Sequence, residues 1–245
     1  MIAHGFRSGL IFAGTMAILA AAAVAMIVVR VLRPGKGRRI CQEVVGGWAG
    51  ETILKLVGVE LVVHREEPWP APPCFYMSNH SSSLDLPILM ALRLPDTRSF
   101  IKERFRWFGP LGLVTMLTGT FFTAPHEDHE RRVALFKKAE EVLRRSGGSV
   151  FGSPEGTRVP AREIGPFNRG VFHIVTNLGI PIVPMLILIP AQSDPGRGYA
   201  VNRGGVVHVH VGDPISTVDW TFEGIEENKE NVRDRFVAWN QELLS

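Results

Sequence analysis

The segment CFYMSNHSSSLD, Cys74–Asp85, passes from a short apolar run into a polar loop. Its first part, Cys74–Met77, has the length and composition of a buried β-strand. Apolar residues then recur at helical spacing over 86–92, and Ser82 or Ser83 can cap that helix. The polar loop is therefore expected at a strand-to-helix junction, where α/β folds commonly place active sites.

His80 and Asp85 are the residues of this loop that can carry acid–base chemistry. An imidazole exchanges a proton near neutral pH, and a nearby carboxylate fixes its tautomer and stabilises its protonated form. Asp85 follows about one helical turn after His80 and can accept the second imidazole N–H. From this spacing alone, a structural interpretation is better supported than a catalytic one: His80 would be a helix-entry residue and Asp85 an incidental surface acid.

Strand-like and helix-like segments alternate through the rest of the chain. Strands are expected at 60–64, 99–101, 120–122, 149–151, 182–189 and 205–211. Helices are expected near 105–117, 127–145 and 171–178, with an amphipathic helix at the C-terminal end. A chain of 245 residues can bury one good core. The pattern predicts an α/β domain over 59–245, with a mixed central sheet flanked by helices.

The segment Gly9–Val29 contains 21 residues without a charge, which is long enough to cross or enter a bilayer as a helix. A cleaved signal peptide is the main rival, because LAAAAVA within this run contains A-x-A cleavage patterns. Only His4 and Arg7 can supply positive charge before the run, and the run exceeds the roughly 7–15 residues of a signal-peptide core. The sequence therefore favours a retained membrane anchor.

Positive charges follow this apolar run at once. They are Arg30, Arg33, Lys36, Arg38 and Arg39, with no acidic residue before Glu43. Such an excess predicts that the following domain lies on the cytoplasmic face of the inner (plasma) membrane, where anionic lipid headgroups attract it. Because the net charge of +3 owes much to this cluster, it does not indicate nucleic-acid binding.

A second, amphipathic helix is expected within Gly37–Val57, where apolar residues recur among polar ones at helical spacing. Gly46, Gly47 and Gly50 count against this prediction, because glycine has a low helix propensity. This helix is expected against the membrane surface or the first helix, and packing on the globular core is nearly as good an interpretation. Residues 1–58 are thus expected to form an N-terminal two-helix membrane-anchoring segment.

No metal site is expected from the sequence. Cys41 and Cys74 are the only cysteines, and their spacing suits neither a disulfide framework nor a zinc site, which agrees with a reducing compartment. His208 and His210 fall on one face of the strand expected at 205–211. They are interpreted as surface or core residues, because no third ligand is spaced to join them.

Four blocks of residues resemble the signatures of the glycerolipid acyltransferase family, in the family's order. The first is Asn79-His80-x4-Asp85. The second runs from Lys102-Glu103 through Phe105, Trp107, Pro110 and Gly112 to Gly119-Thr120-Phe121-Phe122. The third and most specific is Pro154-Glu155-Gly156-Thr157-Arg158, followed by Phe167-x-x-Gly170, and the fourth is Ile180-Pro181-Ile182-Val183-Pro184. Together they span about residues 76 to 190.

The resemblance implies transfer of an acyl group from acyl-CoA or acyl carrier protein to a lysolipid hydroxyl, without a further cofactor. The acceptor that the resemblance implies is 1-acyl-sn-glycerol-3-phosphate, which would give phosphatidic acid. His80 would remove the hydroxyl proton and Asp85 would orient it, so that the acceptor itself is the nucleophile. A hydrolase elbow of the form G-x-S-x-G is absent, since Gly147–Phe151 fails at its final position.

A phosphate on the acceptor needs cations and N–H donors. Arg158 offers a planar bidentate fork and Lys102 a point charge, although a solvated surface lysine is the ordinary alternative for Lys102. Gly156 allows close backbone approach, and Thr157 offers a hydroxyl donor. Glu155 is expected either to bind acceptor hydroxyls or to orient Arg158. The family resemblance implies that these residues hold the glycerophosphate portion.

Departures from the family pattern fall on the acceptor side. They are Ser153, Val159, Gly109-Pro110 and Thr123-Ala124. The same chemistry on another lysolipid, such as a lyso-ornithine lipid, therefore stays open, as does a catalytically silent lipid-binding protein of the same fold. A metal-dependent phosphoesterase is a weaker alternative, because the sequence shows no cluster of metal ligands. The expected partners are membrane lipids, a lysophospholipid acceptor and the thioester donor.

Overall fold

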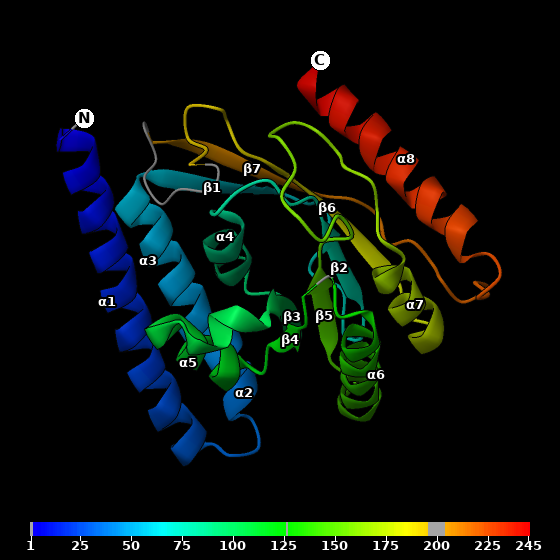
Figure 1. Cartoon of the computed structure of the whole chain (residues 1–245), viewed down its shortest axis with the longest axis horizontal. Helices are drawn as coiled ribbons and strands as arrows, with labels where there is room; N and C mark the ends of the chain where they lie inside the picture. Colours follow the sequence, from blue (N-terminus) through cyan, green and yellow to red (C-terminus); the bar gives the residue numbers. More distant parts are fainter. Residues whose placement is uncertain (1, 126, 196–203) are drawn as a thin grey trace.

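A computed structural model describes residues 2–125, 127–195 and 204–245 and contains a seven-stranded mixed sheet (Figure 1). The strand order is β1-β7-β6-β2-β5-β3-β4. The strands are β1 (Val59–His64), β2 (Phe75–Ser78), β3 (Thr97–Lys102), β4 (Phe121–Thr123), β5 (Ser149–Gly152), β6 (Ile182–Leu188) and β7 (Gly205–Val211). Neighbours pair in parallel, except that β6 and β7 run antiparallel. The predicted α/β class and mixed sheet are confirmed.

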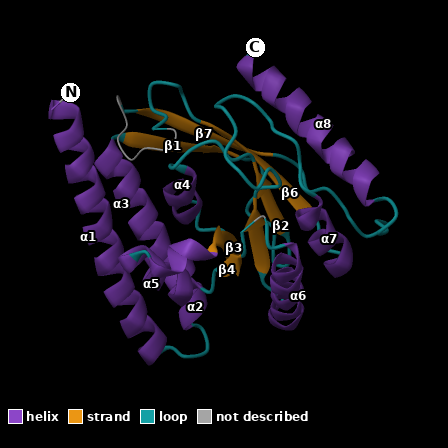
Figure 2. Ribbon diagram, in the orientation of Figure 1, coloured by secondary structure: helices purple, strands orange, loops and turns teal. Residues whose placement is uncertain are grey.

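Helices cover both faces of the sheet (Figure 2). They are α1 (Ile2–Leu32), α2 (Gly37–Ile40), α3 (Gly47–Val57), α4 (Asp85–Ala91), α5 (Gly109–Thr118), α6 (His129–Ser146), α7 (Arg169–Leu178) and α8 (Ile225–Leu244). A π-helical turn, η1 (Cys41–Gly46), joins α2 to α3, and a 3-10 turn, η2 (Glu103–Trp107), precedes α5. One core joins the sheet to α1, α3 and α4, and the other joins it to α6, α7 and α8.

Strand β2 lies at the centre of the sheet and is buried along its whole length. Its alternating side chains enter opposite cores, since Tyr76 packs with α3 and α4 whereas Phe75 and Met77 pack with α7 and α8. A strand buried on both faces reads as a continuous apolar run, as Cys74–Met77 does. The chain therefore enters the polar loop from a fully buried central strand.

The N-terminal segment packs against the domain. Helix α1 is apolar over Phe6–Leu32, long enough to cross a membrane by length and composition, and it is the one such helix within the described residues. The helix predicted within Gly37–Val57 is present, because α2, η1 and α3 follow one another without a break and differ only in the π-helical turn at η1. Its role as a second anchoring helix stays a prediction. Gly50 lets α3 approach α4 closely, because a Cβ there would lie 2.6 Å from the carbonyl oxygen of Pro87.

Candidate active site

The carboxyl ends of parallel strands β2, β5 and β3 meet at one edge of the sheet. The chain leaves β2 into Asn79 and His80, and it leaves β5 into the segment Ser153–Arg158. Lys102 is the last residue of β3. Segments that are far apart in the sequence, and that the sequence marked as functional, therefore reach the same edge of the sheet.

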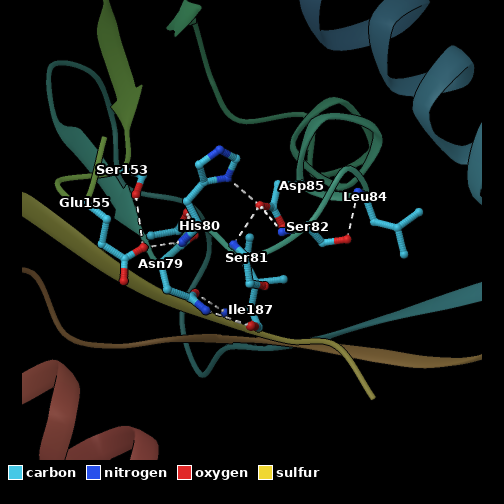
Figure 3. Close-up of polar contacts among 10 residues, drawn as sticks. Asn79, His80, Ser81, Ser82, Leu84, Asp85, Ser153, Glu155 and Ile187 are labelled. Carbon is cyan, nitrogen blue, oxygen red and sulfur yellow. Dashed lines mark hydrogen bonds and ion pairs between the residues drawn. The ribbon is translucent and has the colours of Figure 1, made fainter. Parts of the chain in front are cut away.

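His80 and Asp85 are in direct contact (Figure 3). The distance from His80 Nδ1 to Asp85 Oδ2 is 2.5 Å, and the His80 side chain is one-third exposed. The same Asp85 oxygen accepts the backbone N–H groups of Ser81 and Ser82, at 3.1 Å and 3.0 Å. Three donors thus fix the carboxylate, which in turn fixes the ring and leaves Nε2 for a substrate.

Helix α4 begins differently from the sequence expectation. Its N-cap position is Leu84, without a side-chain cap, and Asp85 is its first residue. Ser82 still contributes, because its Oγ accepts the backbone N–H of Leu84 at 3.2 Å. A carboxylate in the first turn also interacts favourably with the helix dipole. Asp85 therefore takes part of the role that the sequence assigned to the serines.

Asn79 fastens the loop to the neighbouring strand β6. Its Nδ2 donates to the carbonyl of Ile187 at 3.0 Å, and its Oδ1 accepts the N–H of Ile187 at 2.8 Å (Figure 3). Asn79 is 5% exposed, so both bonds are shielded from water. This amide completes the hydrogen bonding of a buried backbone unit and holds the residue next to His80 in place.

Glu155 is buried in contact with the backbone of His80. It is 4% exposed, its Oε2 accepts the N–H of His80 at 2.6 Å, and its Oε1 accepts the N–H of Gly165 at 2.8 Å. Burial raises the pKa of the Glu155 carboxyl, and these two backbone hydrogen bonds oppose the rise. Both oxygens thus accept backbone N–H groups. The two expected roles of Glu155, binding acceptor hydroxyls and orienting Arg158, stay predictions.

The remaining residues of the third block stand nearer to solvent. Gly156 has a φ of +67°, a left-handed conformation that glycine adopts without strain. Thr157 is exposed and Arg158 is half-buried. Within the described part of the chain, Arg158 has no hydrogen bond or ion pair to another side chain, so its guanidinium is available to an anion. Exposed Lys102 also has no such partner there, and no contact joins it to His80.

Sequence reasoning missed how the third block supports the first. Besides the bond from Glu155, the N–H of Val159 donates to the carbonyl of His80 at 2.9 Å. These contacts join residues more than 70 positions apart, so no local pattern could reveal them. The sequence signal that could have suggested this contact is that both blocks occur together in one family. The backbone of His80 is held on both its N–H and its C=O by the segment that carries Arg158.

The sequence of this chain is similar to those of known acyltransferases. The family model described as Acyltransferase matches residues 60–188, more than half of the chain. A 1-acyl-sn-glycerol-3-phosphate acyltransferase of Saccharomyces cerevisiae is 30% identical over 78% of this chain and 63% of its own length. A protein of that name from Haemophilus influenzae is 28% identical over 82% of this chain and 79% of its own length.

The fold is also similar to a solved structure. The crystal structure titled 1-acyl-sn-glycerophosphate (LPA) acyltransferase, PlsC, from Thermotoga maritima has a TM-score of 0.83 and 19% identity, and the match covers 100% of this chain and 97% of that one. The chain spans less than two thirds of the yeast relative and 48% of a chloroplastic relative from Brassica napus. By the match to its family model, the chain belongs to the acyltransferase family.

Proposed function

We propose that this protein is an O-acyltransferase that transfers a fatty acyl group from a thioester to the free hydroxyl of 1-acyl-sn-glycerol-3-phosphate, giving phosphatidic acid. The observation that carries the proposal is the His80–Asp85 pair, in which an imidazole is fixed at 2.5 Å by a carboxylate that two backbone N–H groups hold. The names of the relatives support the choice of acceptor.

The reaction follows from the orientation of the ring. Nδ1 of His80 faces Asp85, so Nε2 is the nitrogen that can take the acceptor's hydroxyl proton as the oxygen attacks the thioester carbonyl. The carbon–sulfur bond then breaks, and the leaving thiolate takes the proton that His80 accepted, so that an ester and a free thiol remain and the imidazole is neutral again. Asp85 stabilises the imidazolium during the transfer. No covalent acyl-enzyme and no cofactor besides the thioester co-substrate, acyl-CoA or acyl carrier protein, is part of this proposal.

The acceptor phosphate is assigned to cations at the same edge of the sheet. Arg158 is half-buried with no protein partner among the described residues, and a guanidinium in that state binds a phosphate bidentately. Thr157 and the backbone at Gly156 add donors. Lys102, at the end of β3, adds positive charge that attracts the headgroup. Glu155 acts as a positioning residue, because it holds the backbone of His80.

The membrane is proposed to meet the α1 side of the domain. Helix α1 buries Ile11, Leu19 and Met26 against the protein, while exposed apolar side chains cover its other face. Trp107 is 83% exposed beside Phe108, whose ring lies 6.4 Å from that of Phe12 on α1. Exposed tryptophan next to an apolar helix is typical of residues at a membrane interface. Lysolipid acceptors then reach the site without leaving the bilayer.

Residues 1–58 thus act, in this proposal, as the anchor of a catalytic domain over 59–245. The positive charges after α1 include Arg33 and Lys36, both exposed, which suit contact with anionic lipids. They support placing the catalytic domain on the cytoplasmic face. Partial burial of α1 against α3 and α5 favours a helix that lies in one leaflet, because a crossing helix would have to leave the domain.

Acyl transfer to a panel of acceptors tests the proposed function. The purified full chain in detergent is given acyl-CoA or acyl carrier protein with 1-acyl-sn-glycerol-3-phosphate, a lyso-ornithine lipid or lysophosphatidylcholine, and labelled products are separated. The highest turnover is expected with the phosphate acceptor. Equal turnover with all acceptors would overturn the choice of headgroup, and bound lipid without turnover would indicate a silent lipid-binding protein.

Arg158→Ala isolates the headgroup contact. The variant is expected to raise KM for 1-acyl-sn-glycerol-3-phosphate and to leave KM for the lyso-ornithine lipid, which has no phosphate, unaffected. Added salt should lower the wild-type preference for the phosphate acceptor. Arg145→Ala is the matched control, because Arg145 is exposed on α6 and pairs with Glu141 on the same helix. An equal change in both variants would contradict the assignment of Arg158.

A further inference from the structure

Three histidines from two strands gather at the edge of the sheet. His64 ends β1, and His208 and His210 belong to β7. One nitrogen from each ring can be chosen so that all three lie within 4.8 Å of one another. The sequence analysis dismissed His208 and His210 as ligands for want of a third. The fold supplies that third histidine from a strand 144 residues away.

Strand pairing brings the three rings to one face of the sheet. Because β1 and β7 pair in parallel, His64 lies opposite His210, and His208 is two residues before His210 on the same strand. Val207 and Val209, on either side of His208, are buried in the core that contains residues of α3 and α4, so the histidines project from the opposite face. The backbone register therefore fixes the spacing of the cluster.

The rings are already in contact. His64 Nε2 lies 2.8 Å from His208 Nδ1, and the rings of His64 and His210 stack with centroids 4.3 Å apart. Two nitrogens bound to a tetrahedral zinc ion lie roughly 3.3 Å apart, with each Zn–N bond about 2.0–2.1 Å. A shared ion would replace the His64–His208 hydrogen bond with two metal–nitrogen bonds and would require the rings to turn, and His64 is exposed.

We propose that His64, His208 and His210 form a binding site for a first-row divalent cation of the zinc type, separate from the His80–Asp85 pair. Three imidazoles without a carboxylate suit zinc, nickel or copper and not magnesium or calcium, which require oxygen ligands. His208 also lines a cavity of about 180 Å³. A water would complete the four ligands of a three-histidine zinc site.

The location gives the ion a structural role. β1 is an edge strand, it follows α3 after the single residue Gly58, and α3 packs on α1. An ion shared by β1 and β7 would cross-link the strand next to the N-terminal helices to the central sheet. Because an ion that binds only the folded state stabilises that state, zinc should raise the melting temperature of the protein.

Calorimetric titration with zinc chloride tests the site directly. The full chain in detergent, freed of any polyhistidine tag and dialysed against chelator, should bind one zinc ion. His210→Gln should weaken binding at least about tenfold, since even loss of an outer partner of a ligand costs about 10- to 100-fold. His173→Gln, which changes a histidine on α7, and His80→Gln should leave the affinity unchanged.

Two results would overturn the site. One is the absence of a bound equivalent in the wild-type chain, and the other is unchanged affinity when His64, His208 and His210 are all replaced by Gln. Thermal unfolding guards against a folding defect in these variants: zinc should raise the melting temperature of the wild type and of His173→Gln but not of the triple variant. An equal rise in all three proteins would also contradict the proposal.

Discussion

Asp85→Asn removes the negative charge behind His80 while it keeps the shape of the side chain. The amide oxygen can replace Oδ2 as acceptor for the backbone N–H groups of Ser81 and Ser82. Oδ1 has no hydrogen-bond partner among the described residues, so the amide NH2 group can occupy its position. The substitution therefore leaves the loop in place and withdraws the stabilisation of the imidazolium.

The size of the loss follows from the geometry. Opposite unit charges about 4 Å apart attract by about 4 kcal/mol at an effective dielectric constant of about 20, and by about 1 kcal/mol in water. The side chains of Asp85 and His80 are 10% and 33% exposed, so the pair lies between these limits. With about 1.4 kcal/mol per tenfold change in rate, kcat should fall by roughly 5- to 1,000-fold.

The assay follows thiol release from acyl-CoA with 1-acyl-sn-glycerol-3-phosphate at saturation. KM for the acceptor should change little, because Asp85 is placed behind the ring and not at the headgroup. Asp128→Asn is the matched control: Asp128 caps α6 by accepting the N–H of Arg131 at 3.2 Å and has no histidine to support. A kcat for Asp85→Asn within twofold of the wild type, or an equal fall in Asp128→Asn, would refute the reasoning.

Three further predictions concern the frame of the site. Asn79→Ala should lower the free energy of unfolding, measured by chemical denaturation, by about 2–4 kcal/mol, because both backbone groups of Ile187 lose a buried partner. A loss below about 0.5 kcal/mol would contradict a stabilising role for these two hydrogen bonds. Gly50→Ala should lower both melting temperature and turnover, because a Cβ there meets α4 at 2.6 Å, whereas Gly9→Ala has open space and should change neither. Burial raises the pKa of Glu155 in the folded protein, so the folded state binds the proton more tightly than the unfolded chain. The resulting stabilisation is full below the ordinary glutamate pKa and is lost as the pH rises through the raised pKa; Glu155→Gln should flatten that slope in denaturation across pH, and an unchanged slope would count against it.

Much of the fold could be predicted because most strands are either short apolar runs or alternate apolar with polar residues. β2 and β7 are clear examples: the first is buried on both faces and reads as continuous apolar sequence, and the second alternates valine with histidine. The strand-to-helix loop that carries His80 and Asp85 was also predictable from its motif. Local pattern is sufficient where a contact joins residues a few positions apart.

Contacts made by the topology were not predictable in this way. Glu155 reaches the N–H of His80 across 75 residues, and only the parallel pairing of β2 with β5 brings them together. His64 meets His208 because the first and last strands are neighbours, which no spacing in the sequence encodes. Gly50 weakened the predicted second helix, yet it is the residue that lets α3 pack closely on α4.

The central claim is that His80 takes the proton of the acceptor hydroxyl during acyl transfer. The most direct measurement compares phosphatidic acid formation from acyl-CoA and labelled 1-acyl-sn-glycerol-3-phosphate by the wild type, His80→Ala and His173→Ala. The wild type and His173→Ala should form product at equal rates, and His80→Ala should be slower by at least about 100-fold with its melting temperature retained. Undiminished product formation by His80→Ala would contradict the account.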